Sequence, residues 1–341
     1  MKWIITGGAG FIGCHSAARF LKAGHEVVVI DHMKRKGADN NLAWLRGQGL
    51  KSFVKASVAD TAAVNALLDE HGDADVVLHL AGQVAVTTSV TDPRSDFESN
   101  ALGTFNILEA VRTVAKGKPA VLYSSTNKVY GNLEHVKVVE RNGRYAYDNL
   151  PSGVNESEPL DFHSPYGCSK GTGDQYVRDY ARIYGLKTIV FRQSCVYGTR
   201  QFGIEDQGWV AWFCLAVVTG QPFTIFGDGK QIRDTLWVDD LIDAYEIGIE
   251  KIHEVSGEVF NLGGGPSNTM SLLELVAKLE KAFGKPLNPP FADWRPGDQR
   301  VFVADISKAK RRLDWSPKVT THEGVERLIE WVKENRSLFG S

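Results

Sequence analysis

The chain has 341 residues, of which 43% are hydrophobic and 23% are charged, and its formal net charge is −2. This length accommodates two domains, and the near-neutral charge argues against a surface that binds nucleic acid or anionic membranes. No stretch of the sequence approaches the roughly 18 apolar residues of a membrane span, and its first residues lack the apolar segment of a signal peptide.

The first half alternates short apolar runs with amphipathic segments, which predicts a parallel sheet covered by helices on both faces. Asp60 is placed to cap one of these helices. We expect strands at Lys2–Thr6, Glu26–Ile30, Ser52–Val54, Asp75–His79, Ala120–Tyr123 and Thr188–Phe191. We expect helices at Phe11–Ala23, Thr61–His71, Asp96–Val114 and Tyr166–Tyr184.

The second half is less regular and richer in loops. Ser271 and Glu274 have the spacing of a capping box at the start of a helix. Residues 132–160 are polar with little periodicity, and we interpret them as a long insertion. We expect helices at Val238–Lys251, Ser271–Phe283 and His322–Glu334.

The four cysteines are far apart and form no CxxC pair, so neither a zinc site nor a disulfide framework is indicated. We therefore expect no metal, and a reduced, cytoplasmic setting. The cysteines are Cys14, Cys168, Cys195 and Cys214.

A glycine-rich segment, Gly7-Gly8-Ala9-Gly10-Phe11-Ile12-Gly13, lies between the first expected strand and the first expected helix. Its glycines permit a tight turn, close approach of a pyrophosphate, and close packing of helix on strand. The helix start then offers free N–H groups to phosphates. Asp31 ends the second strand and favours NAD over NADP, because a carboxylate there binds the ribose and repels a 2′-phosphate. The nearby Arg35 and Lys36 weaken this preference, because their positive charges are able to receive a phosphate.

These observations predict a Rossmann doubly wound parallel sheet with a smaller α/β substrate domain. We place the NAD-binding domain at residues 1–195, with residues 230–262 returning to it. Residues 196–229 and 263–341 form the expected substrate domain.

Tyr166 and Lys170 are four residues apart, so on a helix they share one face. A neighbouring ammonium and an oxidised nicotinamide both favour phenolate, and we expect them to lower the pKa of Tyr166. The tyrosine then serves as a base toward a substrate hydroxyl. Thr126 follows the fifth strand together with Ser124 and Ser125, at the edge where such sheets bind ligands.

The segments TGGAGFIG, HLAGQ, SSTNKVYG, SPYGCSK, QIRDTLWVDD and RPGD resemble the extended short-chain dehydrogenase/reductase superfamily, the NAD-dependent epimerases and dehydratases, over nearly the whole chain. The resemblance implies a catalytic set of Thr126, Tyr166 and Lys170. Ser57 and Val58 replace the acidic residue that many members use for adenine. The implied cofactor contacts are Gly7, Gly10, Phe11, Ile12, Gly13, Asp31, Leu80, Ala81, Gln83, Asn100, Ser124, Tyr166 and Lys170.

Nucleotide-sugar 4,6-dehydratases usually have Thr-Asp-Glu where this chain has Thr126-Asn127-Lys128, and neither an amide nor an ammonium replaces that carboxyl pair. Among epimerases, the chain resembles the CDP-tyvelose (CDP-paratose) 2-epimerases. The segments that carry this are LAGQVAVTTSV, SSTNKVYGNLE, LDFHSPYGCSKG and RQFGIEDQGWVAWF. It implies oxidation and re-reduction at C2 of a CDP-sugar, with tightly bound NAD regenerated in each cycle.

The same resemblance implies that Arg233 and Arg295 bind the pyrophosphate, which suits their planar guanidinium groups. Arg200, in the loop that holds Gln201 and Gln207, is a further candidate for sugar or base. Trp209 and Trp212 are candidates for stacking on cytosine, although their spacing is typical of a helix core. The expected substrate contacts are Ser125, Thr126, Asn127, Gln201, Gln207, Arg233 and Arg295.

Two alternatives stay open at this point. A UDP-hexose 4-epimerase shares the fold, cofactor and tyrosine–lysine chemistry, and a non-catalytic NAD-binding protein shares the fold. The resemblance also allows CDP-hexoses such as CDP-glucose as substrates. It further implies a homodimer formed through the segments Asp96–Val114 and Tyr166–Tyr184.

Overall fold

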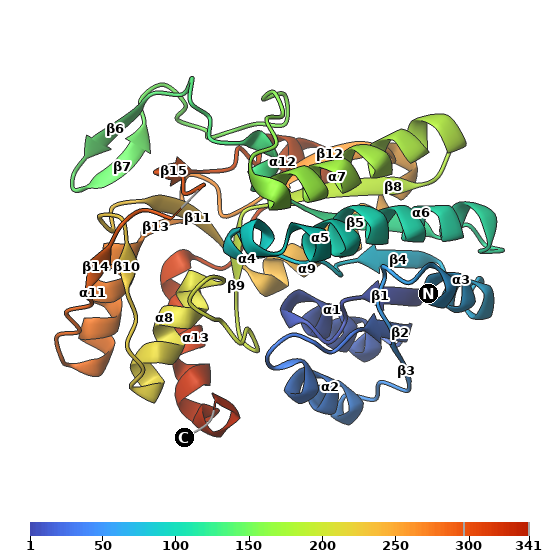
Figure 1. The fold of residues 1–341 in the computed structure, drawn as a ribbon, viewed down its shortest axis with the longest axis horizontal. Coiled ribbons are helices and arrows are strands. Elements are labelled where there is room, and N and C mark those ends of the chain that lie inside the picture. The colour runs from blue at the N-terminus through green and yellow to red at the C-terminus, as the bar shows by residue number, and fades with distance from the viewer. Residues whose placement is uncertain (296, 340–341) are drawn as a thin grey trace.

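The computed structural model describes residues 1–295 and 297–339, so residues 296 and 340–341 of the predicted substrate domain lie outside the described chain. A seven-stranded parallel sheet in the order β12-β8-β5-β4-β1-β2-β3 forms its centre (Figure 1). This confirms the predicted α/β class. The strands are β1 Lys2–Thr6, β2 Glu26–Asp31, β3 Ser52–Lys55, β4 Val76–His79, β5 Ala120–Thr126, β8 Thr188–Gln193 and β12 Glu258–Leu262.

Helices cover both faces of this sheet because its strands are apolar on both sides. In β2, Val27 and Val29 belong to one hydrophobic core, whereas Val28 and Ile30 belong to the other. The first core includes side chains of α1, α2 and α9, and the second includes side chains of α3, α6 and α7. These helices are α1 Phe11–Lys22, α2 Ala38–Gly47, α3 Thr61–Glu70, α6 Gly103–Thr113, α7 Ser164–Tyr184 and α9 Val238–Glu250.

The first core continues into a second layer (Figure 1, left) in which β11 pairs with β9, β13 and β15, and β10 pairs with β14. The proposed division into domains stays a prediction. Residues 230–262, which we assigned to the NAD-binding domain, contribute β12 to the large sheet and β11 to the smaller one. The strands are β9 Cys195–Tyr197, β10 Ile225–Phe226, β11 Ile232–Trp237, β13 Thr269–Ser271, β14 Phe291–Ala292 and β15 Val301–Phe302. The helices of this layer are α8 Trp209–Thr219, α11 Leu272–Phe283, α13 Thr321–Glu334 and the 3₁₀ turn η3 Arg336–Phe339, whereas α10 Ile252–Val255 and α12 Ser307–Leu313 pack against the large sheet and α9.

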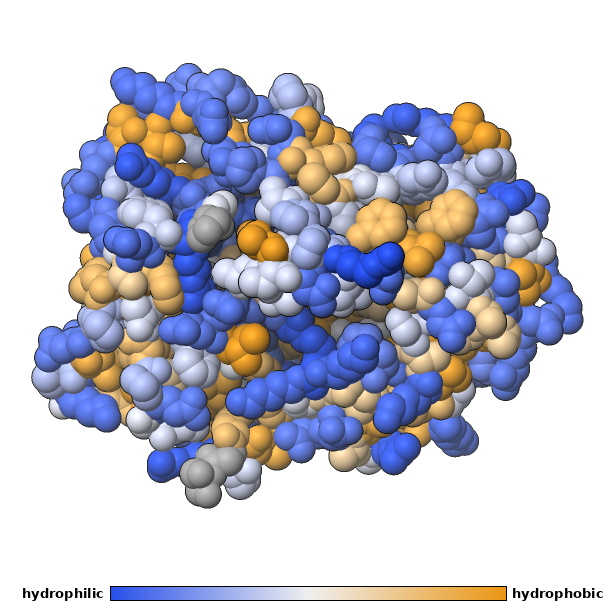
Figure 2. Space-filling view, viewed as in Figure 1, coloured by the Kyte–Doolittle hydropathy of each residue, from blue (hydrophilic) through white to orange (hydrophobic). Residues whose placement is uncertain are grey.

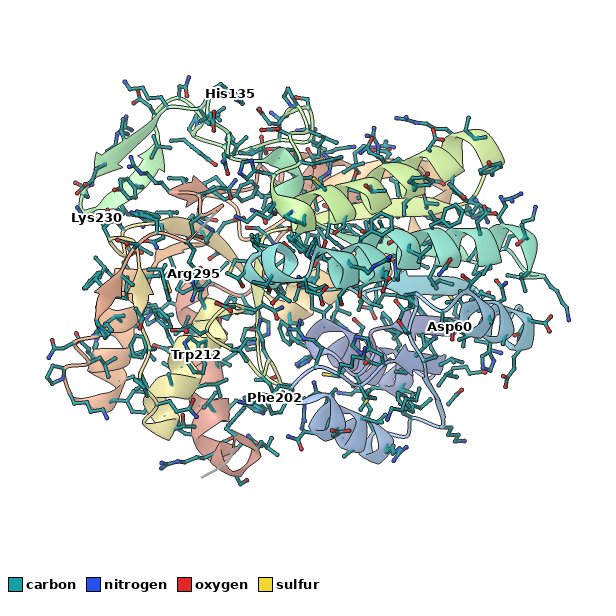
Figure 3. All side chains as sticks on the ribbon, in the orientation of Figure 1. Asp60, His135, Phe202, Trp212, Lys230 and Arg295 are labelled. Carbon is teal, nitrogen blue, oxygen red and sulfur yellow. The ribbon has the colours of Figure 1, made fainter. Side chains whose placement is uncertain are left out.

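Two predicted helix caps are confirmed. The Asp60 side chain accepts a hydrogen bond from the Ala63 amide, and Figure 3 labels Asp60 before α3. Ser271 and Glu274 form a reciprocal capping box at the start of α11. Such caps satisfy amide groups that have no partner inside the helix. None of the helices in the described residues is both long enough and apolar enough to cross a membrane.

The single helix expected over Asp96–Val114 is wrong in detail. The chain instead forms α4 Val86–Thr91, α5 Pro93–Phe97 and a π-helical turn, η1 Glu98–Leu102, before α6 begins. π-turns inside helices often occur near functional sites, because they redirect side chains locally.

The insertion at residues 132–160 is not wholly irregular, because it contains an antiparallel hairpin of β6 Val138–Arg141 and β7 Arg144–Tyr147. Its turn is Asn142-Gly143, and both residues have positive φ, at 53° and 75°. Asn-Gly is the preferred pair for such a turn. The hairpin is anchored to the second layer, since Tyr145 donates to Asp228 and Lys230, labelled in Figure 3, pairs with Glu140.

Candidate active site

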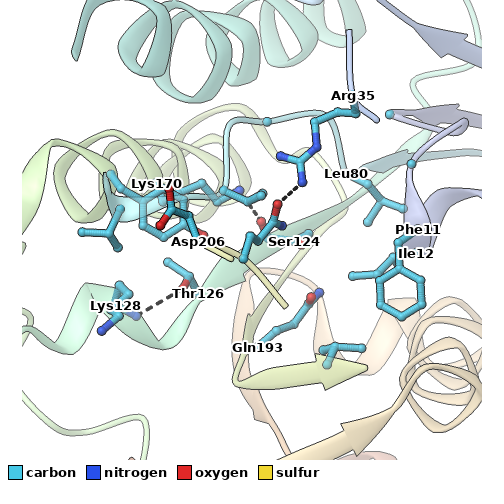
Figure 4. Close-up of a pocket in the computed structure, with 18 of the residues that line it drawn as sticks. Phe11, Ile12, Arg35, Leu80, Ser124, Thr126, Lys128, Lys170, Gln193 and Asp206 are labelled. Carbon is cyan, nitrogen blue, oxygen red and sulfur yellow. Dashed lines mark hydrogen bonds between the residues drawn. The ribbon is translucent and has the colours of Figure 1, made fainter. Parts of the chain in front are cut away.

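One cavity of about 470 Å³ runs along the carboxyl ends of the large sheet and continues into the second layer. Figure 4 shows part of its lining, and Figure 2 shows the surrounding face, which is hollowed near its middle. The structure brings most of the predicted site residues to this cavity. They are Gly7, Gly10, Phe11, Ile12, Gly13, Asp31, Leu80, Ala81, Ser124, Ser125, Thr126, Asn127, Tyr166, Lys170, Gln201, Gln207, Arg233 and Arg295.

The glycine loop between β1 and α1 has the form needed to hold a dinucleotide. Gly7 has a φ of 68°, and a Cβ there would lie 2.8 Å from the Ala81 amide nitrogen. A Cβ on Gly13 would lie 2.6 Å from the Gly8 Cα atom, so that glycine permits helix and loop to pack closely. A Cβ on Gly10, in contrast, would meet one nearby protein atom, the Gly7 carbonyl oxygen at 3.0 Å. The loop therefore fits a pyrophosphate that approaches at Gly10.

Replacing Gly10 with alanine is expected to lower NAD affinity by at least about tenfold. Its backbone, at φ −72° and ψ 177°, is open to any residue, so the unfolding free energy should change by less than about 1 kcal/mol. NAD content after purification and thermal denaturation measure the two effects. Gly47→Ala serves as the control, because a Cβ there has no neighbour within 4 Å. Full NAD content in Gly10→Ala protein would contradict this assignment.

Asp31 is buried at the end of β2, where the sequence places a ribose contact. Its two carboxylate oxygens accept backbone hydrogen bonds, from Ala9 at 3.1 Å and from Met33 at 2.8 Å. These bonds fix the carboxylate at the cavity wall, and each oxygen retains capacity for a further donor. Arg35 also lines the cavity.

Tyr166 and Thr126 meet at the centre of the cavity, where α7 begins and β5 ends. The predicted fall in the pKa of Tyr166 includes the charge of an oxidised nicotinamide and stays a prediction, because the protein by itself shifts this pKa the other way. Burial raises the pKa of Tyr166 to about 12, and a hydrogen bond with the Thr126 hydroxyl opposes this increase. Phenolate formation therefore depends on positive charge brought in with the cofactor.

Lys170 lies one turn after Tyr166 and is also buried. Its ammonium donates to the Ser124 carbonyl and lies 4.3 Å from the centroid of the Tyr123 ring. Burial lowers the pKa of Lys170 to about 7, while Asp174 and Asp96 oppose that shift.

Two predicted cofactor contacts, Gln83 and Asn100, lie in the wall behind the cavity instead of at its surface. Asn100 belongs to the π-turn η1, and its Nδ2 donates to the Gln83 carbonyl at 3.1 Å and to Ser169 at 3.0 Å. Gln83 bonds in turn to both backbone groups of Ala85. The Gln83 side chain and the Asn100 amide nitrogen thus bond to neighbouring protein atoms, whereas the buried Asn100 Oδ1 has no hydrogen-bond partner within the described residues, and the role of both residues toward a cofactor stays a prediction.

Ser125 reaches the cavity, but its hydroxyl is committed to the protein core. It donates to Asp174 on α7 at 2.8 Å, and Asp174 also accepts from Arg192 on β8 at 2.8 and 2.9 Å. Both charged side chains are almost fully buried. This cluster ties α7 to the end of β5 and so fixes Tyr166 relative to Thr126.

Residues 199–208, which we call the bridging loop, contact the first half of the chain on one side and Arg295 on the other. Gln207 accepts a hydrogen bond from Arg35. Phe202, labelled near α2 in Figure 3, packs against Gly37. Arg200, a candidate contact for sugar or base, instead lies over the Trp44 ring of α2, 3.9 Å from the ring centroid.

Two arginines mark the far end of the cavity, as the resemblance implies. Arg233, on β11, lies 3.9 Å from the Asp298 carboxylate. Arg295 pairs with Asp206 of the bridging loop at 3.2 Å and lies 3.7 Å from the Phe226 ring centroid. Figure 3 labels Arg295 among the elements of the second layer.

Sequence reasoning gave Lys128 no role in the site and did not separate Trp209 from Trp212. Lys128 follows the catalytic threonine by two positions, and the motif that excludes dehydration contains it. Trp209 lines the cavity, whereas Trp212 packs among the helices and is absent from the lining. The spacing of the two tryptophans is typical of a helix, but it does not show which of them meets the cavity. Within the described residues, no cluster of three metal-ligating side chains is present.

Comparison with known proteins gives consistent results. Residues 3–263 match the NAD dependent epimerase/dehydratase family. Over 337 residues the chain is 47% identical to a CDP-paratose 2-epimerase of Salmonella typhi, which covers 97% of this chain and 99% of that protein.

Solved structures show the same likeness. The UDP-glucose 4-epimerase of Thermotoga maritima with UDP-glucose aligns with a TM-score of 0.84 and 31% identity, over 98% of this chain and 100% of that one. A UDP-glucuronic acid 4-epimerase of Bacillus cereus, in complex with UDP-glucuronic acid and NAD, aligns with a TM-score of 0.83 and 31% identity, over 98% and 99%.

Proposed function

The chain belongs to the NAD dependent epimerase/dehydratase family, and from this premise we propose that it interconverts CDP-paratose and CDP-tyvelose by epimerisation at C2. It is an NAD-dependent nucleotide-sugar epimerase. One observation carries the reaction class: a single cavity joins the glycine loop, Thr126 with Tyr166, and the two arginines. The choice of C2 is supported by the 47% identity to a CDP-paratose 2-epimerase. Asn127 and Lys128 lie beside the catalytic threonine, where a dehydratase needs carboxyl groups.

The residues of this cavity suit a cycle of oxidation and reduction at one carbon. Tyr166 removes the proton of the C2 hydroxyl, and Thr126 holds that hydroxyl in place. Bound NAD would supply the hydride acceptor and, once the sugar has turned, the hydride donor. Tyr166 then returns the proton. Arg233 and Arg295 retain the diphosphate throughout, which leaves the sugar free to present its other face.

Proton NMR of purified protein mixed with CDP-paratose, without added cofactor, tests this function. Signals of CDP-tyvelose would support C2 epimerisation and would show that NAD purifies with the protein. No change even after NAD is added would contradict the proposal. UDP-glucose is the comparison substrate, because the solved neighbours include 4-epimerases of UDP-sugars, and formation of UDP-galactose alone would favour that alternative.

We also propose a homodimer, because apolar side chains are exposed on one side of the sheet's helices. Figure 2 shows apolar groups over α5 and α6, next to α7. Burying such a patch favours association. Analytical ultracentrifugation should give twice the chain mass, and Phe105→Glu should shift it toward monomer; a monomeric wild type at micromolar concentration would refute the proposal. The exposed residues are Phe97, Phe105, Tyr176, Ile183 and Tyr184.

A cytoplasmic location stays part of the proposal. The four cysteines are free thiols in the structure, and burial raises the pKa of Cys14, Cys195 and Cys214 to about 12. Unpaired thiols are typical of a reducing compartment. Recovery of the protein outside the cytoplasmic fraction of its host would contradict this location.

A further inference from the structure

Lys128 occupies a fixed place between the catalytic residues and the arginine end of the cavity. It belongs to the 3₁₀ turn η2 Asn127–Tyr130, which follows β5 directly. Its amide donates to the Thr126 hydroxyl oxygen at 3.2 Å, the dashed bond in Figure 4. On its other side, a Cβ on Gly167 would lie 3.3 Å from the Lys128 carbonyl oxygen. The backbone of Lys128 is thus held against both Thr126 and the first turn of the helix that carries Tyr166.

The ammonium of Lys128 reaches toward the second layer. It donates to the Gly297 carbonyl at 2.9 Å and to the Gln299 side-chain oxygen at 3.5 Å. Within residues 1–295 and 297–339 these two neutral oxygens are its hydrogen-bond acceptors, so one of its three hydrogens is available to a ligand. Arg233 and Asp298 are the charged groups that act on it. Two cations therefore share one carboxylate here, which favours an anionic ligand.

Sugar geometry shows where that anion belongs. C2 is bonded to C1, the carbon that carries the diphosphate, whereas C4 lies across the ring. An enzyme that reacts at C2 must therefore hold the sugar-side phosphate closer to its tyrosine than a 4-epimerase does. Lys128 is suited to that purpose, because its backbone adjoins Thr126 and the first turn of α7 while its ammonium extends toward Arg233.

We propose that Lys128 binds the sugar-side phosphate of the substrate beside Tyr166 and thereby helps to bring C2 to the catalytic tyrosine. This role rests on the proposed function, because it assumes a CDP-sugar that reacts at C2. Lys128 acts as a specificity-determining contact that is separate from the two arginines. Burial lowers the pKa of Lys128 to about 8, an effect that Arg233 reinforces and Asp298 opposes. The positive charge is consequently lost above that pH unless an anion is bound.

Calorimetric binding of CMP, CDP and CDP-paratose to the NAD-containing enzyme tests this role, since CMP lacks the sugar-side phosphate. Lys128→Met should weaken CDP and CDP-paratose by about 10–100-fold and leave CMP unchanged. Lys128→Arg should retain most of the affinity, and Lys116→Met, an exposed lysine after α6, is the matched control. NAD content and thermal stability of each variant establish that the fold is intact.

The pH dependence supplies a second readout. Wild-type affinity for CDP should fall between about pH 8 and 9.5, by up to tenfold per pH unit, because binding requires the protonated amine. Lys128→Arg should bind CDP equally across that range, since a guanidinium stays charged. A wild-type affinity that does not change with pH would overturn the role.

Three binding patterns would also overturn the proposal. They are unchanged affinity for all three ligands in Lys128→Met, equal weakening of CMP and CDP, and weakening of CDP-paratose without weakening of CDP. Equal weakening would make Lys128 a structural brace for residues 297–299, and the last pattern would make it a contact of the sugar alone. Failure of wild-type enzyme to convert CDP-paratose would contradict the proposed function instead, independently of these binding results.

Discussion

Replacing Tyr166 with phenylalanine is expected to lower kcat by about 10³-fold or more, while bound NAD is retained. The phenol is the group at the centre of the cavity that can exchange a proton with a substrate hydroxyl. Its ring is buried between α7 and β5, and phenylalanine preserves that packing. The loss should therefore appear in turnover, with little change in the affinity for CDP-paratose or in the unfolding free energy.

A steady-state assay of product formation, together with the NAD content of the same preparation, measures this effect. Tyr180→Phe, on the same helix, is the matched control, because its hydroxyl bonds to Glu109 far from the cavity. Turnover within tenfold of wild type in Tyr166→Phe enzyme would exclude Tyr166 as the proton-transfer group.

Replacing Asp174 with alanine is expected to lower the unfolding free energy by about 3–5 kcal/mol. The change leaves the Arg192 guanidinium buried without its carboxylate, and both side chains are at most 2% exposed. It also removes the acceptor of the Ser125 hydroxyl, so the end of β5 loses its tie to α7. Urea unfolding followed by circular dichroism measures the loss.

Two further variants separate charge from packing in this cluster. Asp179→Ala removes an exposed carboxylate from the same helix and should change stability by less than about 0.5 kcal/mol. The double variant Asp174→Leu/Arg192→Met removes both charges and should recover part of the stability lost by Asp174→Ala, because no uncompensated ion remains. A double variant less stable than Asp174→Ala would show that the ion pair is not the source of the effect.

Local signals predicted the large sheet and much of the cavity well. The ends of six strands of that sheet were predicted to within three residues, because apolar runs and glycine turns are encoded in consecutive residues. These strands are β1, β2, β3, β4, β5 and β8. The same holds for the glycine loop and for the spacing of Tyr166 and Lys170. Thr126 was placed at the cavity because strand ends in a parallel sheet share one edge.

Contacts between distant segments were not predictable in this way. The helix α8 is apolar on all sides, so its hydrophobic pattern did not show which side meets the cavity. The Asn142-Gly143 turn was overlooked within a polar insertion. Burial raises the pKa of Tyr166, an effect that motif spacing cannot reveal. Ser125 has a predicted cavity position, yet its hydroxyl bond to Asp174 depends on how α7 packs on the sheet.

The contacts of the bridging loop also bear on whether the oxidised sugar stays in the cavity until its hydride is returned. Arg35 holds Gln207 from one side, and Arg295 holds Asp206 from the other, so both halves of the chain restrain the loop at once. For an epimerase of the proposed kind, an oxidised sugar that departs before its hydride is returned leaves the enzyme reduced and unable to begin another cycle. Because Gln201, Asp206 and Gln207 of this loop line the cavity, the two arginine contacts fix part of the wall within which the sugar must turn. For such an enzyme, the ratio of sugar turning to sugar loss sets how many cycles one molecule completes before it stalls.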